Sequence, residues 1–184
     1  LGAEVIRMDD WTEGGMFWRF LAVDDADICI SRDCDSVVND KEARAVEEWL
    51  KEDYQWHAMH DHRFHRKVSM MGGMWGYRHY EETNRSEKRA QGSAYFFDFR
   101  SKSIRAYMDE WLAENKGRTT VGRDWDQLFL GDSIYAGKAQ TNIMWHGGWV
   151  NDAGRPFPPH PPIRHSRFIG DYAFAVAAWK GFIR

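Results

Sequence analysis

Hydrophobic positions recur with the period of a helix in two long segments of this chain. Between residues 104 and 112 the apolar side chains form one stripe at i, i+3, i+4, i+7 and i+8: Ile104, Tyr107, Met108, Trp111 and Leu112. Gly117 follows where such a helix would end. Residues 40–52 have the same spacing after Asn39, and Glu42 completes the pattern of a capping box. Residues 16–23 and 125–129 predict two shorter helices.

Shorter apolar runs predict strands at residues 3–8, 27–32 and 55–60. Residues 9–15 predict a loop, the Pro-rich residues 154–162 exclude regular structure, and residues 169–178 predict an apolar closing element. Strands that alternate with helices are typical of an α/β fold with a largely parallel sheet. The 184 residues contain no internal repeat, so we expect one domain over residues 1–184.

The strand predicted at residues 27–32 runs into Asp33-Cys34-Asp35. Strands of open α/β sheets present ligand-binding groups at their carboxyl ends. Two carboxylates one residue apart can reach one Mg²⁺ or Mn²⁺, and such ions usually share their ligands with substrate phosphates. The segment therefore suggests a clamp for a metal and a diphosphate, and the alternative is a solvated turn.

Composition narrows the class of protein. The net charge is −3, which argues against a general nucleic-acid binder. No apolar run approaches the roughly 20 residues of a membrane span, and no signal peptide is visible. We interpret both cysteines, Cys29 and Cys34, as reduced, which is consistent with a cytoplasmic protein.

Several motifs occur in one order along the chain: residues 16–22 (MFWRFLA), 32–36 (RDCDS), 44–50 (RAVEEWL), 60–65 (HDHRFH), 72–76 (GGMWG) and 126–130 (DQLFL). In this order they resemble a group of GT-A glycosyltransferases from large viruses and microbes. The resemblance covers roughly residues 1–170 and implies a GT-A (Rossmann-like) fold. It also implies a nucleotide-sugar donor, a divalent metal, Mn²⁺ or Mg²⁺, and transfer of a sugar to a hydroxyl of a glycan or another acceptor.

The first residues (LGAEVI) read as a strand already under way. In the resemblance this segment matches an internal one. We therefore expect a fragment that lacks a first βα portion, which helps to hold the nucleotide base.

The resemblance implies metal ligands at Asp33 and Asp35, with Asp35 as the direct one. It also implies a histidine near the carboxyl end. His146 and His165 are both candidates, and the glycines that follow His146 favour it because they allow close approach of a backbone to a ligand.

Other residues are candidates for binding the donor. The resemblance implies that Asp61 and His62 line the sugar pocket, and that the backbone around Gly73 and the ring of Trp75 contact the sugar. The alternative for Trp75 is a buried ring beside a plain turn.

Arg19 and Arg32 are each suited to a phosphate, since arginine pairs bidentately with such oxygens, and each is equally suited to an ion pair. Asp126 lies off the apolar face of its predicted helix and is the candidate base for the acceptor hydroxyl, or a group that orients donor or acceptor. The alternative for Asp126 is a carboxylate that stabilises a helix start.

Two other functions fit parts of the sequence. Ten tryptophans are compatible with a non-catalytic carbohydrate-binding module. The four closely spaced histidines suggest a zinc hydrolase, although their spacing matches no common zinc motif: His57, His60, His62 and His65. Metal-dependent nucleotide binding would separate the transferase from the binding module, and tightly bound zinc would indicate the hydrolase.

Overall fold

The computed structural model of the protein describes residues 15–33, 36–62, 65–80, 99–116, 125–139, 142–147 and 154–161. The helices are α1 (Trp18–Asp25), α2 (Asp40–Lys51), α4 (Ile104–Asn115) and α5 (Trp125–Phe129), which continues as a π-helix over Leu130–Ala139. The strands are β1 (Ile28–Arg32), β2 (Trp56–His60), β3 (Met74–Arg78) and β4 (Ile143–Gly147). Short 3₁₀ turns cover Gly15–Phe17 and His65–Lys67.

The helices and strands expected between residues 16 and 60 and between 104 and 129 are confirmed within a residue or two at most boundaries. The strand expected at residues 3–8, the end of α4 at Gly117 and the apolar element at residues 169–178 lie outside the described residues. Residues 155–161 lack helix and strand apart from one bridge between Arg155 and His146, as the prolines require.

The four strands form a mixed sheet in the order β1-β3-β2-β4. β3 is antiparallel to both β1 and β2, and β2 is parallel to β4. The predicted largely parallel sheet is therefore wrong, because β3 inserts between β1 and β2. The hydrophobic pattern missed β3 because Gly72, Gly73 and Gly76 are typical of turns rather than strands.

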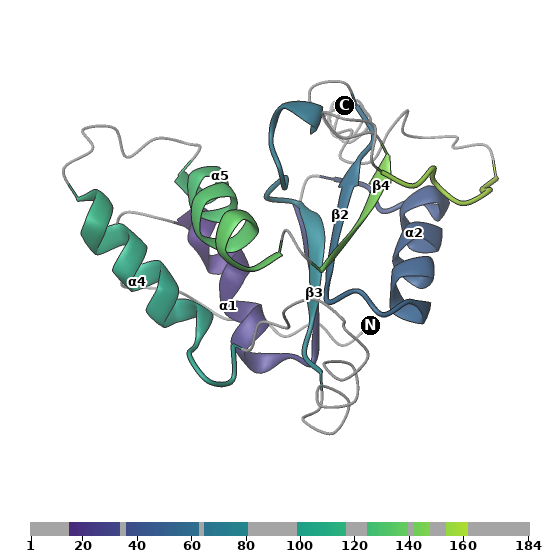
Figure 1. Ribbon diagram of the computed structural model, residues 1–184. Coiled ribbons are helices and arrows are strands. Elements are labelled where there is room, and N and C mark those ends of the chain that lie inside the picture. Colours follow the sequence, from purple (N-terminus) through teal and green to yellow (C-terminus); the bar gives the residue numbers. More distant parts are fainter. Residues whose placement is uncertain are drawn as a thin grey trace, which may run out of the picture.

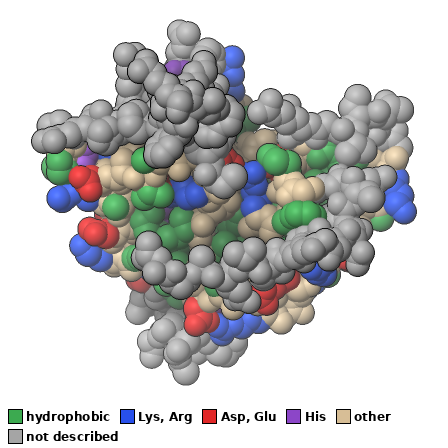
Figure 2. Space-filling model, turned by 180° about the vertical axis from the view of Figure 1, so that it is seen from behind, with side chains coloured by type: hydrophobic (Ala, Val, Ile, Leu, Met, Phe, Trp, Pro, Cys, Tyr) green, Lys and Arg blue, Asp and Glu red, His purple; other side chains and the backbone are tan. Residues whose placement is uncertain are grey.

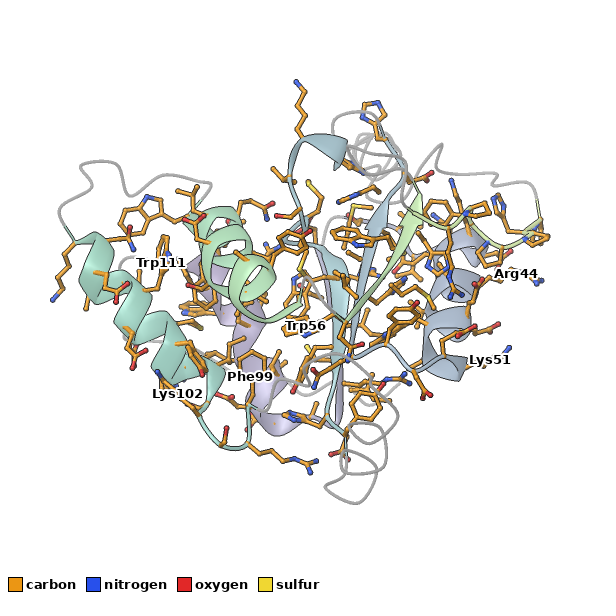
Figure 3. The ribbon with its side chains drawn as sticks, viewed as in Figure 1. Arg44, Lys51, Trp56, Phe99, Lys102 and Trp111 are labelled. Carbon is orange, nitrogen blue, oxygen red and sulfur yellow. The ribbon has the colours of Figure 1, made fainter. Side chains whose placement is uncertain are left out.

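Helices cover both faces of the sheet, with α1, α4 and α5 on one side and α2 on the other (Figure 1). Since side chains alternate along a strand, Trp75 and Tyr77 of β3 enter the core against α1, whereas Gly76 faces Trp49 of α2. Trp56 and Phe99 lie between the sheet and the group of helices that includes α4, and their rings meet edge to face (Figure 3).

The apolar stripe of α4 faces this core as predicted. Ile104, Met108 and Trp111 are buried, and Tyr107 and Leu112 pack against the same cluster. Cys29 of β1 is buried as a free thiol, and burial raises its pKa to about 11.

The amino terminus of α2 confirms half of the predicted capping box. The Asn39 side chain accepts a hydrogen bond of 3.1 Å from the backbone N–H of Glu42. The carboxylate of Glu42 pairs instead with Arg32 of β1, so its charge ties α2 to the sheet.

The strand directions bring several loops to one edge of the sheet. Because β1 and β2 are both antiparallel to β3, and β4 is parallel to β2, these three strands point the same way. Their carboxyl ends therefore meet at one edge, where Asp33 follows β1, Asp61 follows β2 and Gly147 ends β4.

Candidate functional site

The carboxyl end of β1 carries an ion pair between two residues that the sequence singled out. Nη1 of Arg19, from α1, lies 2.9 Å from Oδ1 of Asp33. The Asp33 side chain is 43% exposed and that of Arg19 is 18% exposed. Asp33 is thus the outer, solvent-accessible member of the pair.

The Gly72–Gly73 turn packs directly against this pair. A hydrogen bond of 3.0 Å from the Met74 N–H to the Met71 carbonyl closes the turn. Neither glycine has a positive φ, so neither is required by the backbone conformation. A Cβ at Gly72 would lie 2.7 Å from Nη1 of Arg19, and a Cβ at Gly73 would overlap the Asp33 carboxylate. The absence of a side chain at Gly72 and Gly73 therefore allows the backbone of the turn to lie close to the charged groups of Arg19 and Asp33.

Asp126 closes the inner side of the same site. Its side chain is 1% exposed, and Oδ2 lies 3.7 Å from Nε of Arg19. Among the described residues, neither carboxylate oxygen has a partner in full hydrogen-bond geometry. Burial raises the pKa of Asp126, and Arg19 and the nearby backbone N–H groups oppose that rise. Asp126 is therefore a buried carboxyl beside a guanidinium rather than a carboxylate in solvent.

Two residues that the sequence did not single out hold the glycine turn in place. The hydroxyl of Ser31 donates a hydrogen bond of 2.8 Å to the Gly72 carbonyl. With its amide oxygen and nitrogen exchanged, the orientation that satisfies both groups, Gln127 donates to the Met70 carbonyl at 3.2 Å and accepts from the Gly72 N–H at 2.5 Å. The only sequence signal for these two residues is that each lies next to a predicted site residue or motif: Ser31 precedes the predicted metal motif, and Gln127 follows Asp126.

We define the first-strand site as Arg19, Asp33, Gly72, Gly73 and Asp126. These residues come from α1, the end of β1, the turn before β3 and the start of α5. Five residues from four separate parts of the chain thus converge at one point.

Arg32 and Asp61, both predicted to bind the donor, form ion pairs on the α2 side. Arg32 pairs with Glu42, and Asp61 pairs with Lys41 of the first turn of α2. Each of these charges already has a partner within the protein. His62 lies near His65, with ring centroids 5.6 Å apart.

Trp75 does not lie at the surface of the site. Its ring is fully buried and stacks on Phe20 with a centroid distance of 5.6 Å. The predicted stacking on a sugar has no exposed ring face here, and the alternative of a buried ring beside a turn is the arrangement in the structure.

His146 is also separated from Asp33. Its Nδ1 shares a hydrogen bond of 2.8 Å with Nε2 of His57, and its Nε2 lies 3.5 Å from Glu48. Burial lowers the pKa of His146, although Glu48 opposes the shift. β1 and β4 are the two edges of the sheet, so three strand spacings, or about 14 Å, lie between them. The structure does not combine His146 with Asp33 in one site.

The described residues include no group of three or more His, Cys, Asp or Glu side chains placed to hold a metal ion. Asp33 supplies one carboxylate at the predicted place, while Asp35 and His165 lie outside the described residues. The described residues alone therefore do not make up a metal centre.

Charges of both signs lie on one face of the protein (Figure 2). On the face shown in Figure 2, the Lys and Arg side chains lie among Asp and Glu and beside exposed hydrophobic groups. Within the part of the chain that the structure describes, no helix is long and apolar enough to cross a membrane.

Comparisons with protein-family models, with curated proteins and with solved structures gave no match for this chain. The resemblance to GT-A glycosyltransferases therefore rests on the ordered sequence motifs.

Proposed function

We propose that this protein is a metal-dependent glycosyltransferase of the GT-A type, which moves a sugar from a nucleoside-diphosphate donor to an acceptor hydroxyl. One observation supports this proposal above the others. Arg19, Asp33, Gly73 and Asp126, each chosen from the sequence for a role in such a transfer, lie together at the carboxyl end of β1. Sheet edges of this kind are where open α/β folds bind ligands.

The residues of the site suit the charges of the reaction. Cleavage of the donor places negative charge on the departing diphosphate. The guanidinium of Arg19, 18% exposed beside Asp33, adds positive charge to the site, which favours a diphosphate there. A divalent cation, when bound, would stabilise the same charge as a Lewis acid. We propose Asp33 and Asp35 as its protein ligands and leave His146 out.

Asp126 has the properties of a proton acceptor or an orienting group. It is buried, neither of its oxygens is taken by a hydrogen bond in full geometry within the described part of the chain, and burial raises its pKa, which makes the carboxylate a stronger base. In the proposed reaction it takes the proton of the acceptor hydroxyl or orients the reacting sugar.

The structure favours neither of the other two functions. Of the tryptophans in the described residues, Trp49, Trp56, Trp75 and Trp111 are buried, and Trp18, Trp125 and Trp145 are half-buried, so none presents a fully exposed ring to a carbohydrate. His57 bonds to His146 on the α2 face, whereas His60 packs against Trp145. His57 and His60 of β2 therefore do not converge on one zinc ion.

The proposal is tested by calorimetry with a panel of nucleoside diphosphates, in Mn²⁺ and in chelator. We expect at least tenfold tighter binding of one of them with Mn²⁺. Asp33→Asn and Asp35→Ala should remove most of that gain. Asp109→Asn, which alters an exposed carboxylate of α4, is the control and should bind as the wild type does. Equal affinity with metal and with chelator across the whole panel would contradict the proposal.

The role of Asp126 is tested by kinetics once the screen has identified the donor. Asp126→Asn is nearly isosteric, so the donor KM should change little. We expect kcat to fall by roughly 10² or more, the usual effect of losing a positioned acid–base group. Wild-type turnover in this variant would exclude Asp126 from the chemistry.

A further inference from the structure

Arg19 has two carboxylates within reach and serves them unequally. Nη1 donates to Asp33 at 2.9 Å. The single N–H of Nε donates to the Met16 carbonyl at 3.1 Å. That N–H is therefore committed elsewhere, and Asp126 at 3.7 Å receives charge but no hydrogen bond.

Asp126, the carboxylate that water reaches less, therefore has the weaker contact with Arg19. Asp33 is 43% exposed and can be hydrated, whereas Asp126 is 1% exposed. A buried carboxylate depends far more on a partner than an exposed one does. The position of Arg19 is thus set by competition, and loss of the Asp33 charge should release the guanidinium to the inner carboxylate.

We infer that Arg19 is a positioning residue with two alternative partners: it holds Asp33 when the site is empty, and it moves to Asp126 when another cation takes the Asp33 carboxylate. Only the identity of that cation, the proposed Mn²⁺ or Mg²⁺, rests on the proposed function. The exchange itself rests on the two carboxylates and the one guanidinium. When a cation binds Asp33, this exchange would give Asp126 the guanidinium of Arg19 as its ion-pair partner.

The inference predicts a change of sign that urea unfolding can measure without any ligand. With Asp33 present, Asp126→Asn removes a poorly paired buried charge, so the unfolding equilibrium constant should fall by roughly tenfold. In an Asp33→Asn background, Arg19 is already paired with Asp126. There Asp126→Asn leaves the guanidinium alone, and the unfolding constant should rise by a similar factor.

Arg19→Gln provides the matched control, because it removes the shared partner. When Arg19 is glutamine, Asp126 has no guanidinium to pair with. Asp126→Asn should then stabilise the protein whether residue 33 is aspartate or asparagine. Arg19→Lys is a second control if the Gln variant does not fold, since a single ammonium cannot reproduce the bonds of the guanidinium. An effect of Asp126→Asn that has the same sign in the wild type and in the Asp33→Asn background would overturn the inference.

A metal arm keeps this result separate from the proposed function. Saturating Mg²⁺ added to the wild type should reverse the sign of the Asp126→Asn effect, as Asp33→Asn does. Reversal by Asp33→Asn without reversal by Mg²⁺ would support the two-partner role of Arg19 and count against the metal. Reversal by neither would overturn the two-partner role.

Discussion

At the scale of single residues, the first-strand site concentrates features that cost stability. Asp126 is a carboxyl group in the interior without a full hydrogen bond. Gly72 and Gly73 leave no room for a side chain because charged groups occupy it. Natural proteins keep such features where ligands bind and compensate for them elsewhere. A costly cluster at a sheet edge is therefore itself an argument for function.

The pH dependence of stability should reveal the state of Asp126. Its pKa is raised above the ordinary 3.8 by burial, so the folded state holds this proton more tightly than the unfolded state does. The stability that this proton contributes is fully present below the unfolded-state pKa of 3.8 and is lost as pH rises through the higher pKa of the folded state. Asp126→Asn does not titrate at this position. The variant should exceed the wild type by about 1 kcal/mol at neutral pH, with no advantage below pH 3.8.

Urea unfolding of both proteins between pH 3 and pH 8, at one ionic strength, measures this difference. Asp109→Asn, at an exposed position of α4, should show no such pH-dependent gain. An Asp126→Asn variant that is less stable than wild type at neutral pH would mean that the carboxylate has a strong partner in the folded state.

At the scale of elements, the far edge of the sheet is extended by residues 154–161. Gly147 donates to the Arg155 carbonyl at 2.8 Å, and Arg155 donates to the Trp145 carbonyl at 2.9 Å. Arg155 then reaches Glu48 of α2 at 3.2 Å, and Phe157 stacks on His146. This Pro-rich segment is thus held to β4 and α2 by hydrogen bonds, an ion pair and ring contacts.

Gly147 is the tightest point of this edge. Its φ of 83° lies in the left-handed region, and a Cβ there would overlap the His60 carbonyl. Gly147→Ala should therefore destabilise the protein by about 2 kcal/mol or more, because neither the backbone nor the space tolerates a side chain. Gly137→Ala is the control: its Cβ meets nothing within 4 Å, and it should raise stability by up to about 1 kcal/mol.

Thermal and urea unfolding of both variants provide the comparison. If Gly147→Ala were as stable as Gly137→Ala, the close approach of β2 and β4 at this end would be wrong.

At the scale of the whole molecule, one sheet serves two cores. Trp75 lies in the cluster shared with α1, α4 and α5, and Trp49 of α2 packs on the opposite face against Gly76 and His57. Because both layers use the same strands, neither can lose its packing without disturbing the sheet. We therefore expect the predicted single domain to unfold as one unit.

Trp75→Phe and Trp49→Phe test this expectation from opposite faces. Each should lower the free energy of unfolding by about 1–3 kcal/mol, as for other buried large-to-small changes. Each should also shift one common transition, seen at the same urea concentration by far-ultraviolet circular dichroism and by tryptophan fluorescence. Separate transitions, or a variant that moves only one probe, would show two independent units.

Much of this architecture follows from local pattern. The stripe of α4 and the cap of α2 are recognisable because the residues that decide them are neighbours in sequence. The candidate site was also partly visible: a strand ending in Asp33, a glycine-rich turn and a carboxylate, Asp126, at the start of a predicted helix each have a local signature. What no pattern indicated was that Arg19 would stand between the two carboxylates.

The sequence by itself therefore determined the four helices, the strands β1 and β2 and the polar groups that follow them, because these choices depend on contacts within a few residues. It did not indicate β3 or β4. Only the tertiary structure decided that β3 enters between β1 and β2, that Trp75 faces the core and that His146 lies at the far edge from Asp33. It also decided which charges pair: Glu42 forms an ion pair with Arg32 and does not complete the capping box. These outcomes depend on strand order and on competition between distant partners, and neither is encoded in the spacing of residues along the chain.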